Sequence, residues 1–482
     1  MTSVVIMVFD GLQPSQVNPE LMPNLSALAK SGVTFTNHHP VFPSVTRANV
    51  ASMVTGRSPG GHGLAGNRLM VRDFNPTESI SALEPELTQV AEKTGRVLLA
   101  PTLAEVLSSH GHEYWAIGAG TSGNAYLQNP TAEKFGGATI HHEFTLPRSL
   151  NQELASRFGP WPDEARPNTA RTAHSLRIMT EYILAERDPT VALIWSSEPD
   201  KSQHDSPVGS SLSHAAVKEA DGQFGELMDW LRRTGREADT DVMVASDHGY
   251  STISQVINVE GLVRDAGFPA GGEPGGVTVA ANGGSALFYT RPGDHDTAKR
   301  LAFCLMAQPW CGSLTVSDSA GEIPGTLLAS LVGNQGARCP EIAMSFHWDS
   351  AANGLGYQGT VYSTGGAAGK GQHGSMSKHE MNNVLFAWGP SFKQNIKVNT
   401  PSGNVDLAPT VLRILGINDG PPMDGRVLEE ALANGPDPIS VTRSTKVHQA
   451  EHRLGQRVYN QSIKVSTVGT TIYVDEGNGG LA

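Results

Sequence analysis

The sequence has few cysteines and few charged residues, and each shortage excludes a class of protein. Three cysteines in 482 residues are too few for a disulfide framework, and none has the CxxC spacing of a zinc knuckle. Charged residues make up only 17% of the chain, and 47 acidic against 35 basic residues give a net charge of −12. A nucleic-acid groove needs stripes of lysine and arginine. The sequence shows no such stripe, so we expect no nucleic-acid-binding groove.

Long hydrophobic runs are also missing. No apolar run reaches the roughly 18 residues that a membrane-spanning helix needs, so we expect no membrane span. The first apolar run, residues 4–9, has no basic segment before it and is ended by Asp10, which does not fit a signal peptide. We therefore expect a cytoplasmic protein as the sequence is written, or a periplasmic or secreted one if a leader was removed.

Short β-branched segments alternate with amphipathic segments along most of the chain. The predicted strands include residues 3–9, 113–118, 190–197 and 241–246, and a long predicted helix covers residues 212–233. This alternation is typical of an α/β protein with a parallel sheet that is covered by helices on both faces. Hydrophobic residues make up 39% of the chain, enough for a large core.

The alternation is interrupted in two places, which suggests how the chain is organised. Glycine makes up 53 of 482 residues, about 11% against a usual value of roughly 7%. Glycine-rich turns dominate residues 255–365, and residues 121–165 are predicted to be loop-rich. We predict a catalytic core formed by residues 1–254 and 366–450, an inserted cap subdomain at 255–365, and a C-terminal β-hairpin tail at 451–482. The tail could cover a sheet edge or act as a dimer arm, so a homodimer stays open.

Acidic residues and histidines follow the predicted core strands. Asp10, Asp200 and Asp247 each come after one of them, and the carboxyl ends of parallel strands meet in one crevice. Clustered negative charge is unfavourable without a cation, so we expect a cation there. His204 follows Asp200 by one helical turn, and His248 is adjacent to Asp247. Mixed carboxylate and imidazole ligands suit zinc better than magnesium or calcium.

Several motifs together carry a family resemblance. They are IMVFDGL, MPNLSALAKSGVTFTN, FPSVTRANVASMVTGRSPGGHGLAGN, EPDKSQH, SDHG and GQHG. With these motifs the chain resembles the alkaline phosphatase superfamily, in particular its type I phosphodiesterase/nucleotide pyrophosphatase branch and the related phosphonoacetate hydrolases. The resemblance implies an alkaline phosphatase-like α/β fold, with a doubly wound, mostly parallel central sheet, helices on both faces and an inserted cap subdomain.

The resemblance also implies a set of site residues. Two divalent ions are expected, with Zn²⁺ the first choice and Mn²⁺ or iron as alternatives. One ion would be held by Asp10, Asp247, His248 and the hydroxyl of Thr46, and the other by Asp200, His204 and His373. Thr46 would be the catalytic nucleophile. Asn67 would donate a hydrogen bond to a non-bridging phosphoryl oxygen.

The implied activity is the hydrolysis of a small-molecule phosphoester by in-line attack of Thr46 through a phosphothreonine intermediate. The leading hypothesis is a phosphodiesterase or nucleotide pyrophosphatase. The alternatives are a phosphomonoesterase, a phosphonoacetate hydrolase-like enzyme that cleaves a C–P bond of a phosphonate, and a non-catalytic metal-binding member of the family.

One residue departs from the pattern of the family. Nucleotide-cleaving members commonly have an aromatic residue directly after the nucleophile, where this chain has Arg47. A guanidinium can hold a phosphoryl oxygen or a carboxylate with two parallel hydrogen bonds. Arg47 is therefore either a substrate-binding residue that favours an anionic substrate or part of a structural ion pair.

Overall fold

The computed structural model describes residues 2–482, and its largest element is a ten-stranded sheet. The strand order is β20-β2-β19-β9-β1-β8-β5-β6-β7, and β21 pairs with β2. β1 lies parallel to both of its neighbours, β8 and β9, and β5 lies parallel to β8 and β6. The antiparallel pairs are β19 with β9 and β2, and β6 with β7. The strands are β1 (Ser3–Phe9), β2 (Val33–His39), β5 (Tyr114–Gly118), β6 (Ala138–Ile140), β7 (Thr145–Leu146), β8 (Val191–Ser196), β9 (Thr240–Ala245), β19 (Asn383–Trp388), β20 (Ile396–Val398) and β21 (Ser402–Gly403).

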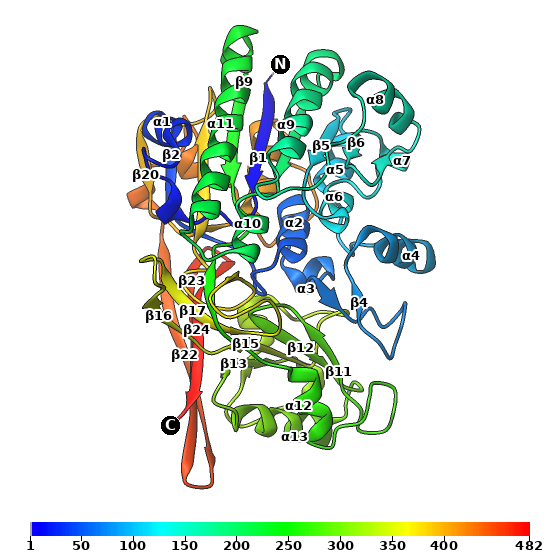
Figure 1. Ribbon diagram of the computed structural model, residues 1–482, viewed down its shortest axis with the longest axis vertical. Helices are drawn as coiled ribbons and strands as arrows, with labels where there is room; N and C mark the ends of the chain where they lie inside the picture. The colour runs from blue at the N-terminus through cyan, green and yellow to red at the C-terminus, as the bar shows by residue number, and fades with distance from the viewer. Residues whose placement is uncertain (1) are drawn as a thin grey trace.

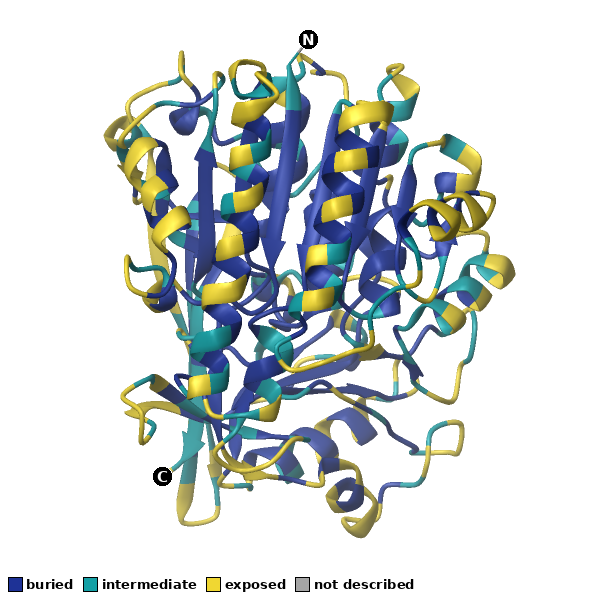
Figure 2. Ribbon diagram, turned by 45° about the horizontal axis from the view of Figure 1, so that its top comes forward, coloured by how far each residue is buried: buried dark blue, intermediate teal, exposed yellow. Residues whose placement is uncertain are grey.

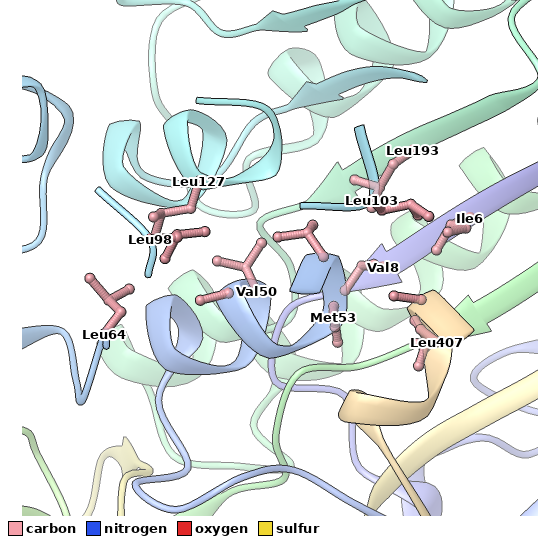
Figure 3. Close-up of a cluster of buried hydrophobic side chains, with 14 of the residues drawn as sticks. Ile6, Val8, Val50, Met53, Leu64, Leu98, Leu103, Leu127, Leu193 and Leu407 are labelled. Atoms are coloured by element: carbon pink, nitrogen blue, oxygen red, sulfur yellow. The ribbon is translucent and has the colours of Figure 1, made fainter. Parts of the chain in front are cut away.

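Helices cover both faces of this sheet, as the alternation of strands and helices predicts (Figure 2). Alternate residues of β1 belong to two separate core clusters: Ile6 packs in one and Met7 in the other. Figure 3 shows the first cluster, where Ile6 and Val8 lie among apolar side chains of several helices. Its helices include α2 (Thr46–Thr55), α4 (Glu84–Thr94), α5 (Leu103–Ser109), α6 (Ser122–Gln128) and α14 (Leu407–Ile414). The helices of the other face are α1 (Pro23–Ser31), α8 (Leu150–Phe158), α9 (Thr169–Ile178) with its π-helical continuation Met179–Arg187, and α11 (Ser211–Arg233).

Smaller sheets lie beyond the carboxyl ends of the parallel strands (Figure 1). A four-stranded sheet consists of β10 (Ser251–Val256), β16 (Trp348–Ala352), β17 (Gln358–Ser363) and β18 (Gly371–Gln372). A five-stranded sheet consists of β11 (Thr278–Ala281), β12 (Ser285–Tyr289), β13 (Cys311–Val316), β14 (Leu327–Leu328) and β15 (Ile342–Phe346). α12 (Val259–Asp265) and α13 (His295–Met306) share a core cluster with the second of these sheets. The domain boundaries expected from the sequence stay a prediction.

The C-terminal tail is a three-stranded sheet rather than a hairpin alone. β23 (Arg457–Val468) and β24 (Thr471–Leu481) form the hairpin whose turn at Gly469 the sequence predicts. β22 (Arg443–Leu454) pairs with β23 along all twelve of its residues. Most residues of β22 are exposed, so it has no hydrophobic run that could have revealed it.

The segment 121–165 contains more regular structure than its glycines and prolines predict. It holds α6, α8, the strands β6 and β7, and α7 (Ala132–Phe135). These elements are short, and most have two to seven residues, too few for a periodic pattern to stand out. Further short elements among residues 2–482 include α3 (Pro59–His62), α10 (Asp200–Asp205), β3 (Arg68–Leu69) and β4 (Ile80–Ser81). Among residues 2–482, no helix combines the length and the apolarity that crossing a membrane requires.

Candidate metal centre

Three adjacent parallel strands deliver acidic side chains to one edge of the central sheet. Asp10 directly follows β1, and Asp247 lies two residues after β9. Asp200 begins α10, which follows β8 after a short loop. Because β9, β1 and β8 are neighbours with the same direction, their carboxyl ends lie at the same edge of the sheet (Figure 1). The structure therefore brings together the three carboxylates that the sequence places after core strands.

Asp10, Asp247 and His248 form the first of two groups of metal-ligand type. His248 Nε2 lies 3.1 Å from Asp247 Oδ2 and 3.6 Å from Asp10 Oδ1. These two carboxylate oxygens are buried and have no hydrogen-bond partner among the described residues. His248 Nδ1 lies 3.0 Å from the carbonyl oxygen of Gly249, a contact that places its proton on Nδ1 and leaves the Nε2 lone pair free.

Asp200, His204 and His373 form the second group. Asp200 and His204 lie one turn apart on α10, and His373 directly follows β18. The Nε2 atoms of His204 and His373 are 3.2 Å apart, and they lie 3.2 and 3.4 Å from Asp200 Oδ1. His373 Nδ1 lies 2.8 Å from the carbonyl oxygen of Ser44, so its Nε2 also faces the group as a lone pair.

The two groups touch each other, and Thr46 lies beside them. The rings of His248 and His373 stack with their centroids 3.6 Å apart and their planes 12° apart. Thr46 is the first residue of α2, and its Oγ1 lies 3.4 Å from His248 Nε2. The seven side chains that the sequence predicts as ligands thus lie around one place, although they are spread over residues 10–373.

Two aromatic residues that sequence reasoning missed orient the carboxylates. Trp195, near the end of β8, donates its Nε1–H to Asp10 Oδ2 at 3.0 Å. Tyr250 donates its hydroxyl to Asp200 Oδ1 at 2.7 Å. Each bond holds a carboxylate oxygen in place beside a candidate ligand group. Both residues lie within a few positions of a predicted site residue, but no spacing rule distinguishes them from core aromatics.

The electrostatics of the site explain why it needs cations. Burial, with the charges of Asp247 and Asp200, raises the pKa of Asp10 well above its usual value. Burial alone would also raise the pKa of Asp200, but the neighbouring His204, His373 and His248 bring it below its usual value. Burial and the charge of His248 keep the pKa of His373 well below normal. The chain alone therefore disfavours the ionised form of Asp10 beside the other two acidic residues, and bound cations would stabilise that ionised form.

The donor set fits divalent metal ions. Each group offers carboxylate oxygen and imidazole nitrogen, and its ligand atoms all lie within 4.8 Å of one another. In the first group the two unpartnered buried oxygens, Asp10 Oδ1 and Asp247 Oδ2, face the Nε2 lone pair of His248 without a hydrogen bond. In the second group two imidazole Nε2 atoms converge on one carboxylate oxygen. Such sets are typical of zinc and similar transition metals.

Asn67 and Arg47 lie next to Thr46 and contact each other through the backbone. The Asn67 side-chain oxygen accepts a hydrogen bond from the Arg47 backbone N–H at 2.9 Å. This bond fixes the amide and leaves its NH₂ group, the donor, without a partner in the described part of the chain. Burial lowers the pKa of the Arg47 guanidinium to about 10, while the charges of Asp10 and Asp200 oppose that shift.

A third group of ligand-type residues, His141, His142 and Glu143, lies elsewhere. Both ring nitrogens of His141 are occupied, since Nε2 lies 3.1 Å from the carbonyl oxygen of Gly120 and Nδ1 accepts the Glu143 backbone N–H. The guanidinium of Arg171 lies 3.1 Å from His142 Nε2. These contacts take the lone pairs that a metal ion would need, so this group does not resemble the other two.

Comparisons with known proteins agree with this geometry. The family model described as type I phosphodiesterase/nucleotide pyrophosphatase matches residues 4–352. An ectonucleotide pyrophosphatase/phosphodiesterase of Caenorhabditis elegans is 22% identical over 426 residues, which cover 86% of this chain and 47% of that protein. A bis(5′-adenosyl)-triphosphatase of Xenopus laevis is 23% identical over 433 residues, which cover 87% of this chain and 78% of that protein.

A solved structure shares the fold. Murine ectonucleotide pyrophosphatase/phosphodiesterase 5, as an inactive threonine-to-alanine variant in complex with AMP, superposes with a TM-score of 0.65 at 17% identity. The superposition covers 90% of this chain and all of that chain. The mixed α/β architecture is therefore the alkaline phosphatase-like fold that the motifs imply. The chain spans at most about half the length of most of the curated relatives it matches.

Proposed function

Because the chain belongs to the type I phosphodiesterase/nucleotide pyrophosphatase family, we propose that it is a metal-dependent hydrolase of phosphoric esters in which Thr46 is the nucleophile. The observation that carries this proposal is the convergence of two ligand groups, Asp10/Asp247/His248 and Asp200/His204/His373, on the hydroxyl of Thr46. Phosphodiesters and nucleotide phosphoanhydrides are the leading substrate class.

The two groups would each hold one divalent ion, with zinc expected and manganese or iron as alternatives. Thr46 Oγ would complete the ligands of the first group, beside His248. Bound metal ions supply Lewis-acid chemistry: they lower the pKa of a coordinated hydroxyl or water and neutralise charge on phosphoryl oxygens. The buried carboxylates of Asp10 and Asp247, which lack hydrogen-bond partners on one oxygen each, support this assignment.

In the first half-reaction, Thr46 Oγ loses its proton to solvent and forms a bond to phosphorus. The bond from phosphorus to the leaving oxygen breaks in line, and that oxygen departs with the electron pair and takes a proton from water. A phosphothreonine results, which still carries the second ester group when the substrate is a diester. In the second half-reaction a water attacks phosphorus, the bond to Thr46 Oγ breaks, and the hydroxyl is restored.

Two features of the chain support the transition state. Thr46 opens a ten-residue helix, whose N-terminal N–H groups and positive dipole end favour a phosphoryl anion. The NH₂ group of Asn67, held in place by the Arg47 backbone, is a preorganised donor for a non-bridging phosphoryl oxygen. Preorganisation matters because such a donor does not have to reorient as charge develops.

Names of relatives also bear on the substrate and the compartment. The murine relative is described as inactive after a threonine-to-alanine substitution and in complex with AMP, which supports a catalytic threonine and a phosphoester substrate here. Several relatives are named ectonucleotide enzymes, and one is a venom phosphodiesterase. Nothing in these findings supports the expected cytoplasmic location, so we propose a secreted or periplasmic one.

The alternatives keep the same site and change the bond or the role. A phosphomonoesterase or a C–P hydrolase of phosphonates would use the same ligand groups and the same threonine. The comparisons provide no observation that favours either of them. A non-catalytic metal-binding role would leave the convergence of the ligand groups on Thr46 without a purpose.

A side-by-side assay tests the proposal. The metal-loaded protein is given bis-p-nitrophenyl phosphate, p-nitrophenyl phosphate and phosphonoacetate, with Thr46→Ala and Thr46→Ser as paired variants. We expect Thr46→Ala to lose about 1,000-fold or more in kcat, Thr46→Ser to retain part of it, and acid-quenched wild type to contain phosphothreonine. Unchanged turnover in Thr46→Ala would refute covalent catalysis, and activity on phosphonoacetate alone would favour the C–P alternative.

A further inference from the structure

Arg47 lies directly beside the proposed nucleophile, in the first turn of α2. It is the second residue of α2, directly after Thr46. The other nine residues of this helix are all buried, whereas Arg47 is partly exposed. Arg47 is therefore the one residue of this helix that is partly accessible, and its guanidinium lies near enough to the site to feel the charges of Asp10 and Asp200.

The guanidinium of Arg47 has no protein partner in the described part of the chain. Its Nε is buried without a hydrogen bond, and its terminal nitrogens, which are not buried, have neither a hydrogen bond nor an ion pair. Only its backbone N–H is used, by Asn67. Other basic side chains on the neighbouring segments differ, since Lys201 and Arg171 both pair with Glu164.

The nearby negative charges do not serve Arg47 as partners. Its charged form is stabilised at a distance by Asp10 and Asp200, but each of these belongs to a candidate metal group. An unpaired and partly desolvated charge is unfavourable, and native proteins rarely keep one without a reason. A guanidinium offers parallel N–H donors that match the spacing of phosphate and carboxylate oxygens. An anionic group of a bound ligand would satisfy these donors.

We propose that Arg47 is a substrate-binding residue that pairs with a second negative charge of the substrate, beyond the single charge that a simple phosphodiester carries. The second charge comes either from a dianionic phosphomonoester or from a phosphate adjoining the scissile one. Arg47 therefore selects substrates by charge, directly beside the nucleophile. This inference rests on the proposed function, because it assumes that phosphorus is attacked by Thr46.

The test compares three substrates in wild type, Arg47→Gln and Arg47→Lys. They are bis-p-nitrophenyl phosphate with one charge, p-nitrophenyl phosphate with two charges on one phosphorus, and a dinucleoside pyrophosphate with one charge on each of two phosphates. We expect Arg47→Gln to lower kcat/KM about 10- to 100-fold for one or both of the doubly charged substrates and less than about 3-fold for the diester. Arg47→Lys keeps the positive charge but loses the forked pair of N–H donors. Its kcat/KM for the doubly charged substrates should therefore lie between those of wild type and Arg47→Gln.

The pattern across substrates decides the outcome. A loss confined to the monoester or to the pyrophosphate supports the proposal and identifies the source of the second charge. An equal loss on all three substrates, or no loss on any, overturns it. Arg413→Gln is the matched control, because it removes the same charge from an exposed ion pair with Glu429 on α14. Thermal melting and metal content verify that each variant folds and binds metal.

A binding measurement separates this inference from the proposed function. Calorimetry on the metal-loaded proteins uses inorganic phosphate and dimethyl phosphate as probes with two charges and one charge. We expect Arg47→Gln to weaken phosphate binding about 10- to 100-fold and to leave dimethyl phosphate unchanged. Equal affinities of wild type and variant for phosphate would overturn the role of Arg47 even if the enzyme is active. Selective weakening in a protein without turnover would support the pairing of Arg47 with a second anionic charge, but it would refute the hydrolase assignment and with it the role in substrate selection.

Discussion

The hydroxyl of Tyr250 provides a sharp test of the second ligand group. It donates to Asp200 Oδ1 at 2.7 Å, the same oxygen that faces the Nε2 atoms of His204 and His373. Burial and the charge of Asp200 raise the pKa of Tyr250 well above its usual value, so the hydroxyl keeps its proton and stays a donor. Tyr250→Phe removes this hydrogen bond and keeps the ring, which packs beside His204 and His373.

The size of the effect follows from the kind of bond that is lost. A hydrogen bond to a charged acceptor contributes about 1.5–3 kcal/mol, which corresponds to roughly 10- to 150-fold in affinity. Loss of such a supporting bond typically weakens metal binding by 10- to 100-fold. The first group should be unaffected, because Trp195 still holds Asp10. We therefore expect one of two metal ions to bind about 10- to 100-fold more weakly and the other to bind as in wild type.

Competition with a chromophoric zinc chelator, combined with metal analysis, measures both affinities. Tyr114→Phe is the matched control, because it removes a buried hydroxyl that has no partner among the described residues. The role assigned to Tyr250 would be refuted by any of three results: an equal loss of affinity for both ions, unchanged affinity for both ions, or the same loss of affinity in Tyr114→Phe.

Two further predictions concern stability. His62 is fully buried, and it accepts the Leu64 backbone N–H at Nδ1; burial lowers its pKa to about 3 from an ordinary 6.5. Because only the unfolded chain takes up the proton between these values, stability falls on acidification below pH 6.5, by about 2 kcal/mol by pH 5 from this residue. Urea unfolding at pH 6.5 and at pH 5 should show a smaller loss in the free energy of unfolding for His62→Gln than for wild type or for a His214→Gln control. Equal losses in all three proteins would contradict this prediction. Gly123→Ala should lower the free energy of unfolding by about 1–3 kcal/mol, since the new Cβ would lie 1.7 Å from the carbonyl oxygen of Ala82. Gly222→Ala, at an exposed position of α11 with open space around it, should raise the free energy of unfolding by about 0.5–1 kcal/mol. A change of the free energy of unfolding in the same direction for both variants would count against this explanation.

Much of the fold could be predicted from the sequence because the strands of a buried parallel sheet are continuous apolar runs. The predicted strand 3–9 is β1, and the long helix predicted at 212–233 is α11, which begins one residue earlier. The exposed strand β22 could not be found in this way, because none of its residues is fully buried and it has no continuous apolar run. The short elements of residues 121–165 are held by tertiary contacts rather than by a pattern of their own.

The candidate site likewise has one part that the sequence predicts and another part that it does not. The positions of Asp10, Asp200 and Asp247 after core strands predict that their carboxylates share a crevice, and the structure brings them there. The arrival of His373 from a segment after residues 255–365, the predicted insertion, depended on the family motif, since no local spacing links it to Asp200. The supporting bonds of Trp195 and Tyr250 depend on side-chain directions that a sequence does not encode locally. The catalytic and metal-binding roles of these residues stay proposals.

The stacking of His373 on His248 has a consequence for how the protein is made. During vectorial synthesis on the ribosome, Asp10, Asp200 and His248 emerge long before His373, and so does the strand β9 long before its neighbour β19. A nascent chain that has not yet reached residue 373 lacks one of the three ligands of the second group, whereas all ligands proposed for the first group have been made by residue 248. On the proposed assignment, we therefore expect capture of the second metal ion to be a late event in biosynthesis that needs the chain beyond residue 373.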